Sequence, residues 1–289
     1  MQTYRLLLAI LLSTTATCTA QAGFWRFENG KAGETAVVVT AESDSEVLVG
    51  TAGVSGKGAP PVYDAEVPYK ALWDGRTCAP AAFANRGSLR FHAPEDAAGA
   101  APAGGEVIVS AKDPVIKPAS FTLEAFIKIG SHVPRHALIA SKRRNGQSGA
   151  SWSLSLSPSG SLSVRFDTEQ GDGPDRVGQF NQCFGGAVVP ADGAWHHVAL
   201  TYEGETRAAA LYLDYRRCGG GTVAAPLVYD ESDCILGRGL DAWLDEVRLT
   251  PEALHYEQFL RPTRFFTDME PETSAAIPLL DETFTRVQS

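Results

Sequence analysis

Acidic side chains are the residues of this sequence best suited to chemistry, and three of them gather at Asp241, Asp245 and Glu246. Two carboxylates that face one glycosidic bond act as nucleophile and general acid in glycoside hydrolysis. Asp245 and Glu246 are adjacent, however, and adjacent residues of a β-strand point to opposite faces. This spacing therefore argues against hydrolysis by that pair.

Histidine pairs are the next candidates, because two imidazoles on one face of an element suit a metal ion. His132 and His136 have helical spacing, but Pro134 between them opposes a helix. His196 and His197 are adjacent within an apolar strand pattern, so they face opposite ways. We expect one of these two to be a packed or hydrogen-bonded core residue instead of a metal ligand.

Asp245 is the acid with the most telling surroundings. It lies in an apolar strand pattern with Trp243 and Val247, which predicts at least partial burial of its carboxylate. A buried charge needs a cation, an arginine or several N–H donors. Calcium prefers carboxylate oxygens, so Asp245 is a candidate calcium ligand. The alternative stays open that backbone N–H groups or an arginine such as Arg26 satisfy it.

Aromatic residues provide the candidate ligand site. Sugar rings stack on exposed aromatic faces that polar groups flank. Trp73, in Leu-Trp-Asp-Gly, is placed for such a role with Asp74 beside it, and so are three loop tyrosines, Tyr63, Tyr69 and Tyr229. The remaining tryptophans of the expected domain lie in apolar strand patterns and are predicted core residues: Trp25, Trp152, Trp195 and Trp243. We predict ligand binding at Trp73 and Asp74.

The elements that position these residues are mostly strands. From Phe121 to Ile129 apolar residues alternate with polar ones, and Pro158-Ser159-Gly160 separates two further alternating segments as a hairpin turn. The same pattern predicts strands at 24–28, 36–40, 88–92, 107–110, 195–202, 208–214, 235–237 and 243–249. One short helix is predicted from Pro251 to about Leu260, capped by Thr250. The sequence thus predicts an all-β sandwich with one short C-terminal helix.

Composition and the first residues bound the class of protein. The 289 residues carry 25 Lys+Arg against 34 Asp+Glu, and this balance disfavours nucleic acid as a partner. Residues 1–22 have a basic start, an apolar run and a small-x-small end, which is typical of a signal peptide. No stretch has the length of a transmembrane segment. We expect a secreted protein, extracellular or periplasmic, with lipid anchoring at Cys18 as an alternative.

Four cysteines remain beyond the signal peptide, and an even number in an exported chain predicts disulfides. They are Cys78, Cys183, Cys218 and Cys234. Elements close in sequence usually lie close in space, so we expect Cys218 with Cys234 and Cys78 with Cys183. Four cysteines allow three connectivities, and the others stay open. No Cys-x-x-Cys pair suggests zinc or redox chemistry.

Five fragments together resemble a known family. They are FWRFE at 24–28, GSLRF at 87–91, SFTLEAFIK at 120–128, AWHHVALTYEG at 194–204 and LDAWLDEVRL at 240–249. In this order they resemble the laminin-G-like, concanavalin A-like jelly-roll family found in exported bacterial proteins, over about residues 24–261. The resemblance implies two curved antiparallel sheets, a jelly-roll sandwich. The chain departs from the family pattern at 42–46 and at Asp214-Tyr215.

What the resemblance implies for function is recognition of glycans or proteins, often with a calcium ion. Glycosidases of this fold resemble one another in a Glu-x-Asp-x-x-Glu strand, to which the nearest segment here is 241–246. We predict a signal peptide at 1–22, one domain at 23–261 and an acidic tail at 262–289. The domain is expected to be a non-catalytic module that binds extracellular carbohydrate. The alternatives are a structural or adhesion domain that binds cell-surface proteins, and a divergent glycoside hydrolase.

Overall fold

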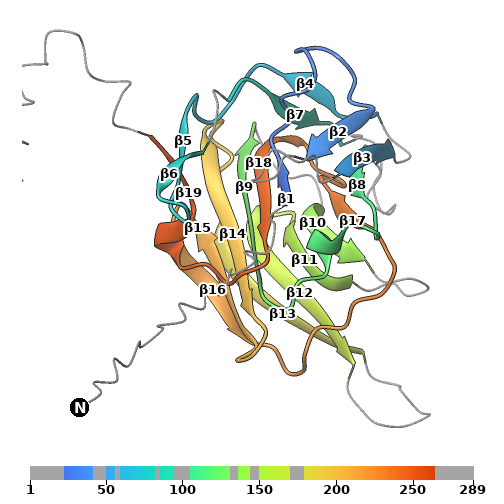
Figure 1. The fold of residues 1–289 in the computed structure, drawn as a ribbon, viewed down its shortest axis with the longest axis vertical. Helices are drawn as coiled ribbons and strands as arrows, with labels where there is room; N and C mark the ends of the chain where they lie inside the picture. The colour runs from blue at the N-terminus through green and yellow to red at the C-terminus, as the bar shows by residue number, and fades with distance from the viewer. Residues whose placement is uncertain are drawn as a thin grey trace, which may run out of the picture.

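Nearly all regular structure in the chain is β-strand (Figure 1). The computed structural model describes residues 23–41, 50–55, 59–81, 85–93, 105–130, 136–143, 150–169 and 179–263. Within these ranges the strands form two eight-stranded sheets and one three-stranded sheet. All pairings are antiparallel, which confirms the all-β jelly-roll sandwich.

Sheet A has the strand order β16-β15-β14-β9-β18-β7-β4, and β1 also pairs with β18. Its long central strands coincide with the segments that show the clearest apolar alternation in the sequence. The strands predicted at those segments are therefore confirmed. The strands are β1 (Gly23–Trp25), β4 (Val62–Asp64), β7 (Ser88–Phe91), β9 (Phe121–Ile129), β14 (Trp195–Glu203), β15 (Ala208–Leu213), β16 (Arg216–Thr222) and β18 (Ala242–Thr250).

Sheet B has the order β13-β12-β11-β10-β17-β8-β3-β2. The expected turn at 158–160 joins β11 to β12, and Gly160 takes φ 78° there, which glycine adopts without strain. The strands are β2 (Val38–Ala41), β3 (Gly50–Ser55), β8 (Glu106–Val109), β10 (Ala137–Arg143), β11 (Ala150–Leu156), β12 (Ser161–Glu169), β13 (Gln179–Val188) and β17 (Cys234–Leu236).

The third sheet lies at one side of the sandwich, next to sheet A (Figure 1). Its order is β19-β5-β6, so the strand nearest the C-terminus pairs with one from the first third of the chain. The strands are β5 (Leu72–Asp74), β6 (Ala79–Ala81) and β19 (Leu260–Pro262). We call this three-stranded sheet the small sheet.

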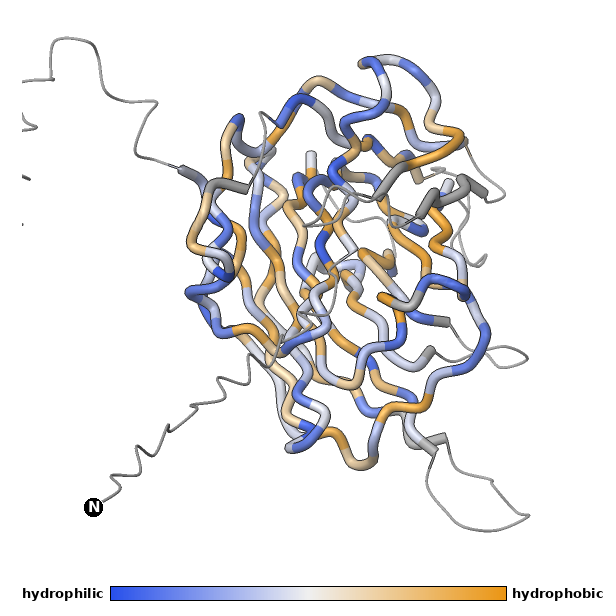
Figure 2. The backbone as a smooth tube through the Cα atoms, in the orientation of Figure 1, coloured by the Kyte–Doolittle hydropathy of each residue, from blue (hydrophilic) through white to orange (hydrophobic). Residues whose placement is uncertain are grey.

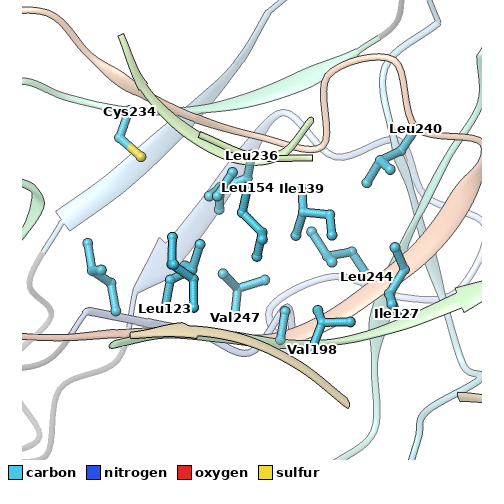
Figure 3. Packing of buried hydrophobic residues seen from close by; sticks show 14 of the residues in the cluster. Leu123, Ile127, Ile139, Leu154, Val198, Cys234, Leu236, Leu240, Leu244 and Val247 are labelled. Carbon is cyan, nitrogen blue, oxygen red and sulfur yellow. The ribbon is translucent and has the colours of Figure 1, made fainter. Parts of the chain in front are cut away.

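The main core fills the space between sheets A and B. Figure 3 shows Leu123, Val198 and Val247 of sheet A facing Leu154 and Leu236 of sheet B. The hydropathy of the backbone trace follows this arrangement, with apolar stretches along the strands and polar ones in the connections (Figure 2). Each fully buried leucine contributes roughly 1.5–3 kcal/mol by leaving water.

The expected tryptophan positions are confirmed for two of four residues. Trp25 and Trp152 are buried in the core at 1% and 0% exposure. Trp195 and Trp243 are only partly buried, and they lie on the side of sheet A that faces away from sheet B. The opposite faces of their strands are apolar too, so the sequence pattern did not show which face points into the core between the sheets. The prediction that both tryptophans lie in that core was therefore wrong.

The expected helix from Pro251 to Leu260 is wrong. Thr250 ends strand β18, and only two short 3-10 helices occur in the described residues, η1 (Pro114–Ile116) and η2 (Tyr256–Gln258). The Thr122 hydroxyl donates to the Glu252 carbonyl at 2.7 Å and accepts from the Leu254 N–H at 2.8 Å. These bonds use backbone groups that a helix would need, so a distant strand overrides the local capping signal.

The expected disulfides are wrong too, because all four cysteines carry free thiols: Cys78, Cys183, Cys218 and Cys234. Cys234 lies on an inner strand of sheet B and points into the core (Figure 3), whereas Cys218 lies on edge strand β16 of sheet A. Neighbouring position in the sequence did not bring them together. Burial raises the pKa of the Cys234 thiol to about 12.

Several expectations fall on residues outside the described ranges. These are the signal peptide at 1–22 with Cys18, the segment at 42–46, His132, and residues 264–289 of the tail. In the part of the chain that the structure describes, no helix has the length and apolar character needed to cross a membrane.

Candidate functional site

Trp73 lies at the centre of the small sheet, in β5. Its neighbours Leu72 and Asp74 are 2% and 6% exposed, so both face inward, and alternation along the strand turns Trp73 outward. The indole is 37% exposed, and it is one of six large apolar side chains exposed in the described residues. The prediction that Trp73 presents an accessible aromatic face agrees with this geometry.

Arg261 lies directly opposite Trp73 across the β5–β19 pairing, on the same face of the small sheet. Its guanidinium is 5.1 Å from the ring centre of Tyr215 and 5.8 Å from that of Tyr256. One nitrogen, Nη2, donates to the Tyr256 carbonyl at 2.9 Å. The Nε–H is buried without a hydrogen-bond partner. We call Trp73, Tyr256 and Arg261 the Trp73 face.

Sequence reasoning missed two members of this face. Tyr256 is 37% exposed and begins η2, next to the N-cap residue His255, whose ring centre is 4.4 Å from that of Tyr256. Arg261 is in a strand of three residues, which is too short to show an alternating pattern. Tyr256 lies in the segment predicted to be a helix and Arg261 directly follows that segment, so no local signal linked them to Trp73.

Asp74, the second predicted ligand-binding residue, faces the interior. Its Oδ1 atom accepts from the Arg76 N–H at 2.9 Å and forms an ion pair with Arg248 Nη1 at 2.8 Å. Arg248 is only 1% exposed and belongs to sheet A. The Asp74 carboxylate therefore ties the small sheet to the sandwich beneath it instead of facing a ligand.

Glu124 completes this buried ionic connection. Its Oε1 atom accepts from Arg248 Nε at 2.7 Å, and its Oε2 atom contacts His197 Nε2 at 2.9 Å and accepts from the Leu260 N–H at 2.9 Å. Burial alone would raise the pKa of Glu124, but the Arg248 charge and the His197 hydrogen bond lower it to about 2. The central strand β5, through the ion pair of Asp74 with Arg248, and the edge strand β19, through the Leu260 N–H, are thus fixed to sheet A by buried bonds.

His197 confirms the expectation of one hydrogen-bonded core histidine. It is 2% exposed, and its ring stacks on Tyr215 with centres 4.6 Å apart and planes at 12°. Tyr215 and Asp214 both take positive φ in the turn between β15 and β16, where the sequence lacks glycine. The Tyr215 hydroxyl donates to the Leu260 carbonyl at 3.1 Å, which adds one more bond from the sandwich to the small sheet.

The acidic pair Asp245 and Glu246 departs from strict strand alternation. The register of β18 against β9 shifts between Asp245 and Arg248, and Glu246 takes φ 49°, so the strand bulges here. Both carboxylates are 0% exposed. Glu246 forms an ion pair with Arg26 at 3.0 Å, so neither carboxylate of this pair is open to a substrate.

The expected burial of Asp245 is confirmed, and protein groups bind its carboxylate. Oδ2 accepts from Asn85 Nδ2 at 2.7 Å, and Oδ1 accepts from the Glu246 N–H at 2.8 Å. Burial, and then the charge of Glu246, raise the pKa of Asp245 well above its ordinary value. No group of three or more His, Cys, Asp and Glu in the described ranges is placed to hold a metal. Protein donors thus reach both oxygens of the Asp245 carboxylate, and calcium binding there stays a prediction.

The other aromatic candidates have partners within the protein. Tyr63 is buried, and the Tyr229 hydroxyl donates to the Pro118 carbonyl at 2.9 Å. Tyr69 is 37% exposed, and its ring meets Phe126 edge to face at 5.8 Å. Trp73, by contrast, lies opposite Arg261, a cation that has no acidic partner among the described residues.

The architecture and the site together define the class of protein. Two antiparallel sheets packed face to face, with an exposed aromatic and arginine face at one side, are an all-β sandwich of the lectin-like type. Residues 103–258 match the Laminin_G_3 family, described as the concanavalin A-like lectin/glucanases superfamily. The chain belongs to this family. No curated protein matches the chain.

Among solved structures with a similar fold are two complexes of a neurotoxin binding domain. The binding domain of botulinum neurotoxin DC in complex with SialylT has a TM-score of 0.51 and 13% identity, covering 82% of this chain and 48% of that one. The same domain in complex with rat synaptotagmin II gives 0.51 and 12%, covering 82% and 49%. The Ruminococcus gnavus IT-sialidase CBM40 bound to alpha2,3 sialyllactose gives 0.40 and 14%, covering 53% and 89%. The chain thus spans about half the length of the neurotoxin domains it matches.

Proposed function

We propose that this chain is a non-catalytic recognition module that binds extracellular carbohydrate through the Trp73 face. The observation that carries the proposal is the outward indole of Trp73 on a strand that Asp74 anchors to sheet A through its buried ion pair with Arg248. A rigid aromatic platform stacks on a sugar ring with little loss of side-chain entropy. The anchoring by Asp74 and Arg248 supplies that rigidity.

Two further observations support a binding role over catalysis. The nearest candidates for a pair of catalytic carboxylates, Asp245 and Glu246, are buried and bound to Asn85 and Arg26. The family includes lectins as well as glucanases, and the neurotoxin structures of similar fold are described as binding domains. The proposal includes export to an extracellular or periplasmic location, as the sequence of residues 1–22 indicates.

A glycan array tests the proposal with the wild-type chain and Trp73→Ala. We expect the wild type to bind a defined set of glycans, and Trp73→Ala to lose at least about tenfold in affinity, because a stacked aromatic dominates such a contact. Trp73→Phe keeps an aromatic face and should retain most of the binding. Absence of binding to every glycan, or full binding by Trp73→Ala, would contradict the proposal.

Two controls separate loss of the site from loss of the fold. Val188 is 54% exposed on β13 in sheet B, so Val188→Ala changes an apolar surface residue away from the small sheet. We expect it to bind as the wild type does. The melting temperature of Trp73→Ala should stay within a few degrees of the wild type, since the indole is partly solvated already. Incubation with a panel of polysaccharides, with reducing ends measured, checks that no hydrolysis occurs.

A further inference from the structure

Arg261 differs from the cations beside Trp243 and from the two buried arginines of the sandwich. The cations beside Trp243 have acidic partners: Arg90 is 2.6 Å from Asp241, and Lys128 pairs with Glu66. Arg26 and Arg248 are paired as described above. Within the described part of the chain, Arg261 forms no ion pair, and its contacts are one carbonyl and two tyrosine rings.

The environment of Arg261 suits an incoming anion. The guanidinium lies 5.1 and 5.8 Å from the centres of two tyrosine rings, and these contacts restrict the orientation of the planar group. Only Nη2 is used within the protein, and the guanidinium has a second terminal nitrogen, Nη1. A guanidinium binds a planar carboxylate through two parallel N–H bonds more strongly and more selectively than it binds a neutral acceptor.

The distance between Trp73 and Arg261 restricts what the anion is attached to. Residues directly opposite on paired strands have Cβ atoms roughly 4.5–5.5 Å apart. A sugar ring stacked on Trp73 therefore has its edge within reach of the Arg261 side chain. A carboxylate bonded directly to that ring would meet the guanidinium while the ring stays on the indole.

We propose that the Trp73 face is selective for glycans that carry a carboxylate on the stacked sugar, with Arg261 as the specificity-determining residue. The inference rests on the proposed function and names the ligand class of the same site. Sialic acids and uronic acids share this chemistry. Arg261 discriminates between an acidic sugar and its neutral counterpart, and Trp73 supplies the contact common to both.

Isothermal titration with two matched pairs of ligands tests this. One pair is sialyllactose and its carboxyl methyl ester, and the other is a galacturonic acid trimer and its methyl ester. We expect the acidic member of at least one pair to bind about tenfold more tightly, the usual gain from a charge-assisted hydrogen bond. Which pair responds distinguishes a sialic acid from a uronic acid. Equal affinity for acidic and neutral members in both pairs would overturn the inference.

Arg261→Gln and Arg261→Lys test the residue itself. We expect Arg261→Gln to reduce the preference for the acidic member over the neutral member to less than about twofold. Arg261→Lys should retain part of the preference, because it keeps the charge and loses the planar fork. An unchanged preference in Arg261→Gln would refute the role of Arg261. Melting temperatures near that of the wild type confirm that the variants are folded.

Two outcomes separate this inference from the proposed function. If neutral glycans bind, Trp73→Ala abolishes that binding, and no acidic glycan is preferred, the recognition module stands and only the carboxylate selectivity fails. If no glycan binds in any arm, the proposed function itself fails. A sulfated lactose that binds as tightly as sialyllactose would also overturn the inference, since the site would then select any anion.

Discussion

Glu124 carries its charge in the interior, and replacing it with glutamine tests whether that charge fixes the small sheet to the sandwich. The carboxylate is 0% exposed, and its pKa is lowered from 4.5 to about 2. Burial opposes this lowering, so the net change reflects the hold of Arg248 and His197 on the anion. Glu124→Gln keeps the shape of the side chain and removes the charge.

The expected magnitude follows from linkage between protonation and folding. A lowering of the pKa from 4.5 to about 2 is worth roughly 3 kcal/mol at about 1.36 kcal/mol per unit. Because the folded state has the lower pKa, this contribution is complete above the unfolded pKa and is lost as the pH falls through the folded pKa. The stability gap between wild type and Glu124→Gln should therefore fall to about half by about pH 3.

Urea unfolding followed by tryptophan fluorescence measures this gap at neutral and at acidic pH. Comparison of the two chains at each pH cancels the titration of other groups, such as Asp245. Glu231→Gln is the control, because its side chain is 80% exposed and its ion pair with Lys117 lies at the surface. A Glu124→Gln chain as stable as wild type at neutral pH, or a gap that does not change with pH, would refute the reasoning.

Two more changes have expected outcomes. Asp245→Asn should leave the free energy of unfolding at neutral pH unchanged or raise it by up to about 1 kcal/mol, measured by urea unfolding. The pKa of Asp245 is raised in the folded state, so the charged carboxylate costs stability once the pH exceeds the unfolded pKa, and asparagine avoids that cost. A loss of several kcal/mol would contradict this. Without reductant, iodoacetamide should label the exposed Cys78 and Cys183 first and reach Cys234 only after unfolding, because that thiol is buried and its pKa is raised to about 12. Mass spectrometry counts the labels, and any cysteine that stays unlabelled in denaturant would indicate a disulfide.

The strands of the sandwich could be predicted because their signal is local. Along Phe121–Ile129 the main core residues recur at every second position, and the pairing with β14 preserves that alternation. The helix at 251–260 also had a local signal, but the Thr122 hydroxyl, from a strand far away in the sequence, uses the backbone groups of Glu252 and Leu254. No window of sequence around Pro251 contains that information.

The candidate site was predictable only in part, for the same reason. Trp73 stands out as a tryptophan in a polar stretch outside the long strand patterns. Asp74 was predicted to bind ligand beside Trp73, because its actual partner, Arg248, lies in a distant strand between apolar residues. Asp245 and Glu246 were expected on opposite faces, but the bulge at Glu246 breaks the alternation on which that expectation rested. Pairing between distant segments decided each of these cases.

The pairing of β5 with β19 has a consequence for the order in which the protein is completed. Trp73 leaves the ribosome early, yet Arg261 and the strand that carries it come near the end of the chain. Contacts between such distant positions form late, because the chain between them must first be ordered. A preference of the Trp73 face for acidic glycans would therefore require that synthesis has passed β19, and a chain cut short before residue 260 would lose Arg261 while retaining every described strand of the two large sheets.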